Sequence, residues 1–245
     1  MPQNKKHMPP PGTRLYAVGD VHGRPDLVDK ILARIAKDAK KSPALQTKIV
    51  FLGDYVDRGP DSRGVVRRLM KPPPEGIDRL ICLKGNHEDM LLRFLDHPLH
   101  GGFEWILLNG GAATLASWGV DLPAILDSKQ IKGMHRAFLD CLAPEERLFL
   151  AHLQLKHVEG GVVFVHAGLR PGVALAHQVP DDLLWIRDAF LDHAGPHGKL
   201  VVHGHTVTFE PELLPHRAGI DTGAWRTGTL TALGLEGDKR WILHT

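Results

Sequence analysis

Five short fragments of this chain place Asp, Asn or His beside glycine, where these side chains could bind metal ions. In chain order they are Gly19-Asp20-Val21-His22-Gly23, Gly53-Asp54-Tyr55-Val56-Asp57-Arg58-Gly59, Gly85-Asn86-His87-Glu88, His166-Ala167-Gly168 and Gly204-His205-Thr206. Their donors are carboxylate and amide oxygens and imidazole nitrogens, which suit manganese, iron or zinc better than a thiolate site would. Together the fragments predict one dinuclear metal site, and hydrolysis of a phosphate ester is the first hypothesis for its chemistry.

Most of these fragments directly follow a short apolar run typical of a β-strand. Strands are expected at 15–18, 49–52, 80–83, 162–165, 200–202, 230–233 and 241–243, the last two as a hairpin around Gly234 and Gly237. Helices are expected from Pro25, from Asp61 or Ser62 to Met70, and from Met90 to Leu95. Repeated β-α-β units predict parallel strands, whose carboxyl ends would bring the fragments together.

The segment 97–156 has a different character from the rest of the chain. Glycine pairs and helically spaced apolar residues predict short helices without a clear strand, and therefore a helical cap inserted between strands. Residues 1–12, with four prolines and two lysines, are expected to be a disordered leader. The predicted organisation is a single α/β domain over 13–245 that carries this cap.

Composition limits the possible partners and compartment. The formal net charge is +2, with 30 basic and 28 acidic side chains, so no global field draws the chain to nucleic acid or an anionic membrane. Cys82 and Cys141 are the only cysteines, which favours a reducing compartment. No apolar run reaches the roughly 18 residues of a membrane span. We therefore expect a soluble cytoplasmic protein without nucleic-acid or membrane partners.

The order and spacing of the five fragments resemble the phosphoprotein phosphatase family of calcineurin-like metallophosphoesterases, and especially its bacterial serine/threonine phosphatases. The resemblance extends from about Leu15 to Leu233, which is nearly the whole chain. It implies an α/β fold with a β-sandwich of two mixed sheets, flanked by helices and carrying the small helical cap.

The resemblance also implies which residues bind the metals. The first ion would be held by Asp20 and His22, Asp54 would bridge both ions, and the second ion would be held by Asn86, His166 and His205. His205 could also lie between the two ions. The expected cofactors are two divalent ions per chain, manganese first, with iron or zinc as alternatives, because all three accept this ligand set.

Catalytic and phosphate-binding roles follow from the same resemblance. His87 would be the general acid, with Asp57 orienting it, and Arg58 would clamp the phosphate. Arg187, in the segment Trp185-Ile186-Arg187, would be a second clamp. Many relatives carry arginine before Gly-Asn-His-Glu, whereas this chain has Lys84, so a third guanidinium contact is in doubt.

Each of these residues also has a purely structural alternative. His87 could pair with Glu88 or Asp89, Arg58 with Asp57 or Asp61, and Arg187 with Asp188. His203 could support a ligand or simply end a strand, and Asp221 is expected to be structural or to support a ligand.

One further pattern, Cys141 and Arg147 in the spacing of thiol-dependent phosphatases, is rejected. Pro144 lacks an N–H, and Glu145 and Glu146 would repel a phosphate.

The resulting hypothesis is a metal-dependent phosphomonoesterase. It would act on phosphoserine or phosphothreonine in a protein or peptide, by in-line attack of a hydroxide that bridges the metals, with no phosphoenzyme. One alternative is a hydrolase of dinucleoside polyphosphates such as diadenosine tetraphosphate, since cap and cleft select the substrate. A nuclease is disfavoured by the near-zero charge, and a non-catalytic scaffold by the intact ligand set. The sequence does not determine the oligomeric state.

Overall fold

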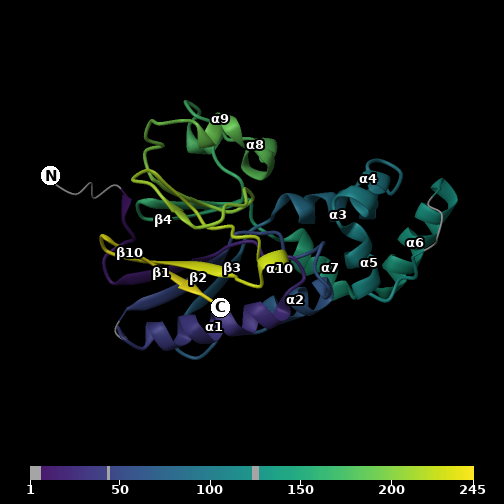
Figure 1. The fold of residues 1–245 in the computed structure, drawn as a ribbon, viewed down its shortest axis with the longest axis horizontal. Helices are drawn as coiled ribbons and strands as arrows, with labels where there is room; N and C mark the ends of the chain where they lie inside the picture. The colour runs from purple at the N-terminus through teal and green to yellow at the C-terminus, as the bar shows by residue number, and fades with distance from the viewer. Residues whose placement is uncertain (1–6, 43–44, 123–126) are drawn as a thin grey trace.

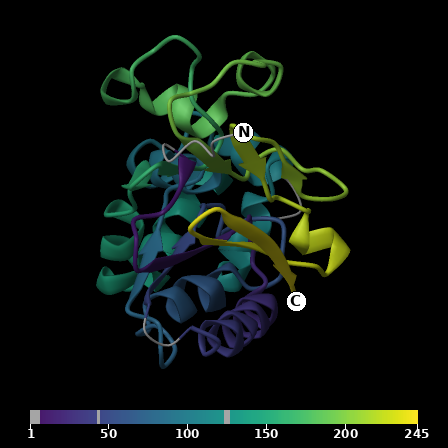
Figure 2. The same cartoon turned by 90° about the vertical axis from the view of Figure 1, so that its left-hand side faces the viewer.

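Two five-stranded sheets face each other at the centre of the molecule, with helices outside them. The computed structural model describes residues 7–42, 45–122 and 127–245. In both views α8 and α9 cover the outside of one sheet and α1 covers the outside of the other (Figures 1 and 2). The cap helices extend to one side of the sandwich in Figure 1. The predicted α/β sandwich of two mixed sheets with flanking helices is confirmed.

The first sheet joins both ends of the chain, in the order β10-β9-β1-β2-β3. Its strands are β1 (Thr13–Val18), β2 (Gln46–Phe51), β3 (Arg79–Cys82), β9 (Thr231–Glu236) and β10 (Lys239–His244). β1, β2 and β3 are parallel, as predicted, and β9 and β10 form the predicted hairpin. Gly234 lies within β9 opposite Trp241, so only Gly237 belongs to the turn.

The second sheet has the order β4-β5-β6-β8-β7. Its strands are β4 (Lys156–Glu159), β5 (Val162–Val165), β6 (Leu200–His203), β7 (Glu212–Leu213) and β8 (Arg217–Gly219). β5 and β6 were expected, whereas β4, β7 and β8 were missed. These three strands are short or polar, so pairing with apolar neighbours defines them rather than a local strand pattern.

The helices begin and end close to the sequence signals. They are α1 (Pro25–Ala39), α2 (Ser62–Leu69), α3 (Asn86–Asp96), α4 (Gly102–Leu108), α5 (Gly111–Ser117), α6 (Ser128–Cys141), α7 (Pro144–Ala151), α8 (Pro180–Trp185), α9 (Asp188–Leu191) and α10 (Ala224–Thr227), with a 3₁₀ turn at Leu175–His177. Asp61 caps α2 by accepting a hydrogen bond from Gly64 N at 2.7 Å. α3 begins four residues earlier than predicted, at Asn86.

The apolar core lies in three layers. Side chains from both sheets, among them Val50, Phe164 and Leu233, fill the space between the sheets. The outer face of the first sheet packs with α1, α2, α3 and the cap, and the outer face of the second sheet packs with α8 and α9. Each sheet is therefore buried on both faces, which fixes the positions of its strand ends.

Helices α4 to α7 lie within the segment predicted as a cap, and Glu146 of α7 fastens this region to α2. Its carboxylate accepts hydrogen bonds from Arg63 Nε at 3.0 Å, Arg67 Nε at 2.6 Å and Trp118 Nε1 at 2.8 Å. Burial alone would raise the pKa of Glu146, but these donors lower it to about 2. We call Glu146, Arg63, Arg67 and Trp118 the cap buttress.

The amino-terminal segment differs from its prediction where the structure describes it. Residues 1–6 of the expected leader lie outside the described residues, but residues within 7–12 make backbone hydrogen bonds to both sheets. Gly161 N donates to Met8 O at 2.8 Å, and Gln46 N donates to Gly12 O at 2.9 Å. These backbone contacts hold in place part of a segment that was predicted from its composition to be disordered.

In the part of the chain that the structure describes, no helix combines the length and apolar character needed to cross a membrane.

Candidate metal centre

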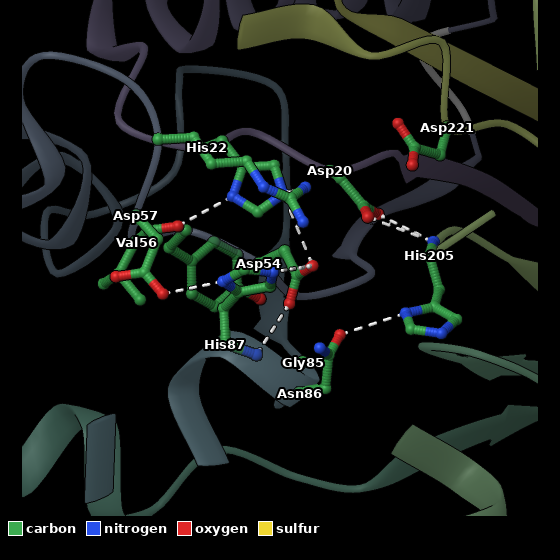
Figure 3. Close-up of polar contacts among 12 residues, drawn as sticks. Asp20, His22, Asp54, Val56, Asp57, Gly85, Asn86, His87, His205 and Asp221 are labelled. Atoms are coloured by element: carbon green, nitrogen blue, oxygen red, sulfur yellow. Dashed lines mark hydrogen bonds and ion pairs between the residues drawn. The ribbon is translucent and has the colours of Figure 1, made fainter. Parts of the chain in front are cut away.

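The five sequence fragments meet at one end of the sandwich, directly after β1, β2, β3, β5 and β6, with Asn86 and His87 on the first turn of α3. Figure 3 shows labelled residues of all the fragments except His166-Ala167-Gly168. Backbone hydrogen bonds join the loops directly: His22 N donates to Asp54 O at 2.8 Å, and Gly204 N donates to His166 O at 2.9 Å. Because carboxyl ends of parallel strands share one edge, the fold gathers donors that are far apart in sequence. This is the arrangement that the strand pattern predicted.

The backbone of the centre is strained. Among the described residues, five residues other than glycine have positive φ, and all belong to the predicted fragments: His22 (46°), Asp54 (53°), Asp57 (70°), Arg58 (67°) and His205 (62°). Such a conformation is costly for residues with a side chain and is concentrated at functional sites. At Gly85 a Cβ atom would lie 2.0 Å from Asp54 Oδ1, so glycine is required for this close packing.

One group of donors forms around Asn86, His166 and His205. His166 Nε2 lies 2.8 Å from Asn86 Oδ1 and 3.4 Å from Asp54 Oδ1, and His205 Nδ1 lies 3.0 Å from Asn86 Oδ1. His166 Nδ1 contacts Leu52 O at 3.0 Å and so carries the proton, which leaves a lone pair on Nε2. Several lone pairs therefore converge, an arrangement that a cation stabilises.

A second group forms on the other side of Asp54. His22 Nε2 lies 3.5 Å and His87 Nε2 lies 3.9 Å from Asp54 Oδ2. His22 Nδ1 donates to Val56 O at 2.7 Å, so Nε2 keeps its lone pair. Asp54 thus belongs to two three-residue groups and gives one oxygen to each, as a bridging carboxylate would. The resemblance put Asp20 with His22, whereas the compact group contains His87.

Asp20 lies beside this group in a strongly acidic environment. Its Oδ2 accepts a hydrogen bond from His205 N at 3.0 Å, and its other neighbours include Asp221 (Figure 3). Burial and the charges of Asp221 and Asp54 raise the pKa of Asp20 well above its ordinary value. No arginine or lysine pairs with these three aspartates among the described ion pairs. The charge of Arg58 acts on Asp221, and divalent cations would supply the further positive charge that three carboxylates need.

The histidines are in the form that binds metals. Burial lowers the pKa of His22 to about 3 and, together with nearby His166, the pKa of His205 to about 2, so both imidazoles are neutral. His205 Nε2 is buried without a hydrogen-bond partner. Donor atoms on one metal, each about 2.1 Å from it, lie about 3 Å apart, close to the spacings observed. The residues therefore fit two divalent ions but do not specify which metal.

His87 is held by a buried carboxylate. His87 Nδ1 donates to Asp57 Oδ2 at 2.6 Å, and Trp105 Nε1 donates to the same oxygen at 2.8 Å. Thr114 Oγ1 donates to Asp57 Oδ1 at 2.5 Å. Burial alone would lower the pKa of His87, but the charges of Asp54 and Asp57 raise it. Trp105 and Thr114 belong to the cap region, and sequence reasoning missed both, because neither stands in a recognisable motif.

Glu88 does not pair with His87, and Asp89 pairs with Arg93, so the structural alternative for His87 is wrong. The Glu88 carboxylate is fully buried and accepts hydrogen bonds from the backbone N–H groups of Asp54, Tyr55, Val56 and Gly85. Burial raises the pKa of Glu88 to about 7, and the charge of Asp54 adds to this shift. Glu88 therefore fixes the strained loop that presents Asp54, a role that its place in the fragment did not reveal.

Two exposed arginines border the centre. Arg58 Nη1 donates to His22 Nε2 at 2.7 Å, and its guanidinium lies 5.9 Å from the ring of Trp225. The positive charge of Arg187 acts on His166 and His205, whose pKa values burial and this charge both lower. Among the described ion pairs none joins Arg58 to Asp57 or Asp61, or Arg187 to Asp188.

His203 is turned away from the donor groups. Its ring lies 5.0 Å from that of Phe190 in the layer outside the second sheet. Of its two sequence interpretations, the strand-end role agrees with this position. Asp221, by contrast, lies next to Asp20 and accepts a hydrogen bond from Gly223 N at 2.9 Å.

Comparison with known proteins points to one family. The sequence model described as calcineurin-like phosphoesterase matches residues 13–216. An asymmetrical bis(5'-nucleosyl)-tetraphosphatase PrpE from Oceanobacillus iheyensis is 27% identical, over 89% of this chain and 87% of the relative. A symmetrical bis(5'-nucleosyl)-tetraphosphatase from Paracidovorax citrulli is 31% identical, over 74% of this chain and 49% of the relative.

Solved structures share the fold at lower sequence identity. A crystal structure assigned provisionally to a diadenosine tetraphosphatase has 20% identity and a TM-score of 0.64, covering 97% of this chain and 96% of that one. A cold-active protein tyrosine phosphatase from a psychrophilic Shewanella species has 14% identity and a TM-score of 0.58, covering 98% and 84%. With the family match over most of the chain and the paired donor groups at the strand ends, the chain belongs to the calcineurin-like phosphoesterase family of metal-dependent hydrolases.

Proposed function

We propose that this protein hydrolyses dinucleoside polyphosphates and cleaves diadenosine tetraphosphate asymmetrically. The observation that carries the proposal is the match with asymmetrical tetraphosphatases over 87–89% of both chains. The symmetrical enzyme matches over only 49% of its own length. The dinucleotide hydrolase, which was the alternative from the sequence, thus replaces the protein serine/threonine phosphatase as the first hypothesis.

Within this proposal, the ligands are those that the resemblance implied, arranged around Asp54. Asp20, His22 and Asp54 would hold one divalent ion, and Asp54, Asn86, His166 and His205 the other, with manganese as the first candidate. The bound ions would shield the phosphoryl charge and lower the pKa of a water molecule. His87 lies close enough to Asp54 to share the first ion in the absence of substrate.

The surrounding side chains would bind and orient the substrate. Arg58 and Arg187, exposed on the two sides of the centre, would hold phosphoryl oxygens, for which a planar guanidinium is well shaped. His87 would donate its Nε2 proton to the leaving oxygen, while Asp57 holds Nδ1 and so fixes the ring orientation. Trp105 and Thr114 would position Asp57.

The substrate is expected to be a soluble nucleotide rather than nucleic acid or a membrane component, in keeping with the net charge of +2. Two free cysteines, Cys82 and Cys141, agree with a reducing cytoplasmic location.

The test is product analysis with purified, manganese-loaded protein. Diadenosine tetraphosphate should give equal amounts of AMP and ATP, whereas symmetrical cleavage would give ADP alone. A phosphoserine peptide assayed in parallel should have a kcat/KM at least about tenfold lower. A higher kcat/KM for the phosphopeptide would overturn the proposal and restore the protein phosphatase hypothesis. The metal content of the same preparation tests the prediction of two manganese ions per chain.

A further inference from the structure

A cavity of about 390 Å³ lies between the cap and α8, beside the metal centre. Its walls include Met90, Arg93, Glu104, Trp105, Asn109 and Trp185. Trp105 is also the residue that donates to Asp57, and the ring of Trp185 lies 6.4 Å from that of His205. The cavity therefore shares one wall with the support of His87 and another with the second donor group. Its volume is within the usual range of small-molecule sites.

Trp185 offers an unused aromatic surface at this cavity. It is 39% exposed at the end of α8, although its neighbours Leu183 and Leu184 are buried. An indole half open to water next to a charged centre is a ready partner for a flat aromatic ligand, and stacking a nucleobase on such a ring contributes about 1–3 kcal/mol.

The positions of Trp185 and Arg187 indicate how a bound nucleotide would be oriented between the cavity and the metal centre. The two residues are separated only by Ile186, whose backbone is extended with ψ of 141°. The charge of Arg187 acts on His166 and His205. One segment thus places an aromatic ring at the cavity and, two residues later, an exposed arginine whose charge reaches the metal donors. A nucleotide likewise carries an aromatic base and a charged phosphate a short distance apart.

The remaining walls suit the edges of a purine better than an amino-acid side chain. Arg93, which is also paired with Asp89, and Glu104 supply charged groups, and Asn109 supplies an amide. His97 and His100 supply imidazoles, and Met90 supplies a polarisable apolar surface. A phosphoserine side chain has no ring that could use this combination of aromatic and polar groups.

We propose that this cavity is a nucleoside subsite in which Trp185 stacks on a purine base whose phosphate chain extends to the metal centre. The inference rests on the proposed function and deepens it, because it names the surface that distinguishes a nucleotide from a phosphopeptide. It also assigns a specificity role to the cap and α8 rather than to the metal donors.

The test compares Trp185→Ala, Trp185→Phe and a matched control, Phe209→Ala. Phe209 is 95% exposed in the loop after His205 and lies outside this cavity. Binding of a methylene-bridged, non-hydrolysable diadenosine tetraphosphate is measured by calorimetry, alongside inorganic tripolyphosphate, which has no base. Turnover of diadenosine tetraphosphate is measured on the same preparations.

Trp185→Ala should weaken binding of the dinucleotide analogue about tenfold or more and raise KM for diadenosine tetraphosphate similarly. Trp185→Phe should stay within about threefold of wild type, because a smaller aromatic ring remains. Phe209→Ala should bind the analogue like wild type. Tripolyphosphate, which has no ring to stack on Trp185, should bind all three variants within about threefold of wild type, and Phe209→Ala should also turn over diadenosine tetraphosphate like wild type.

Wild-type analogue affinity in Trp185→Ala would overturn the subsite. An equal loss of tripolyphosphate binding would also overturn it, because Trp185 would then merely support the phosphate clamp. Failure of the wild type to cleave diadenosine tetraphosphate, with cleavage of phosphopeptides, would reject the proposed function separately. The analogue-binding comparison would still decide between a nucleoside subsite and none.

Discussion

The metal centre and the cap buttress both bury carboxylates, yet their electrostatics are opposite. Glu146 in the buttress has two guanidinium groups and an indole as donors, which lower its pKa to about 2. Asp20 in the centre has two further carboxylates as neighbours, which with burial raise its pKa well above the ordinary value. In the buttress, the arginine side chains balance the carboxylate charge. In the centre, bound cations would be needed to balance the charges of the clustered carboxylates.

This contrast separates residues that hold the fold from residues that perform the reaction. A buried charge with complete partners contributes to stability, and removing one partner is costly. A cluster of like charges in strained backbone is maintained by the surrounding structure and indicates function. Stability and activity should therefore respond to different substitutions in the two regions.

The largest effect is expected for Asp54→Asn. An amide cannot give one anionic oxygen to each donor group, so kcat/KM for diadenosine tetraphosphate should fall by about 10³-fold or more. Circular dichroism should show an intact fold, and metal analysis should show fewer than two ions per chain. Near wild-type turnover by the purified variant would refute the assignment of Asp54 as the shared ligand.

His87→Asn tests the place where the two regions meet, since Asp57 connects His87 to Trp105 and Thr114 of the cap. Loss of the proton donor should lower kcat by about 10²-fold for a phosphoserine peptide. The decrease should be smaller for diadenosine tetraphosphate, because a nucleotide phosphate is a better leaving group than an alkoxide. Equal loss on both substrates would mean that His87 acts mainly through the metal site.

Glu146→Gln should affect stability instead of chemistry. Removing the charge leaves two guanidinium groups without their anionic partner, so the free energy of unfolding should fall by about 2–3 kcal/mol. This is less than for a fully buried ion pair, because solvent screens the exposed Arg67. Urea unfolding measures this effect, and Glu145→Gln on the same helix is the exposed control. Metal content and activity at low temperature should match wild type. A loss of metal from Glu146→Gln would contradict the claim that the buttress affects stability alone.

The pH dependence of Glu146→Gln follows from the lowered pKa. Such a carboxylate stabilises the fold above the pKa it has when unfolded, and the stabilisation is lost as pH falls towards about 2. The difference between wild type and variant should therefore be complete at pH 7 and shrink steadily below about pH 4.5.

Asp20→Asn should give the smallest effect on stability and one of opposite sign. Removing one charge from the aspartate cluster should stabilise the metal-free protein by about 1 kcal/mol at pH 7, and this gain should vanish below about pH 4, where Asp20 is protonated in both states. Added manganese should stabilise wild type more than the variant. Asp121→Asn, an exposed control, should show neither change. Destabilisation of metal-free Asp20→Asn would contradict the electrostatic contrast between the metal centre and the cap buttress.

Local sequence signals predicted the elements that carry the centre. Val162 to Val165 and Leu200 to Val202 stand out as strands because both faces of their sheet are buried. β4 and β8 could not be predicted in this way, since Lys156 and Arg217 interrupt their apolar pattern and pairing across the sheet defines them. The hairpin was predicted, but β9 continues through Gly234 to Glu236, so the turn begins only at Gly237.

The candidate site was predictable to the extent that its residues stand in fragments. The donor residues around Asp54 were named from the sequence and lie together, although their individual roles stay predictions. Trp105, Thr114 and the backbone-binding role of Glu88 were not predictable, because they depend on how the cap and α3 fold onto the loop. His87, and not Asp20, forms the compact group with His22 and Asp54. This placement also depends on tertiary packing.

The pairing of β1 with β9 has a consequence for biosynthesis. β1 lies between β2 and a strand that begins at Thr231, so its second edge stays open until Thr231 to Glu236 have been synthesised. His205 is also translated after the other candidate ligands. A nascent chain that ends before these residues therefore has an unprotected edge at β1 and an incomplete set of candidate metal ligands.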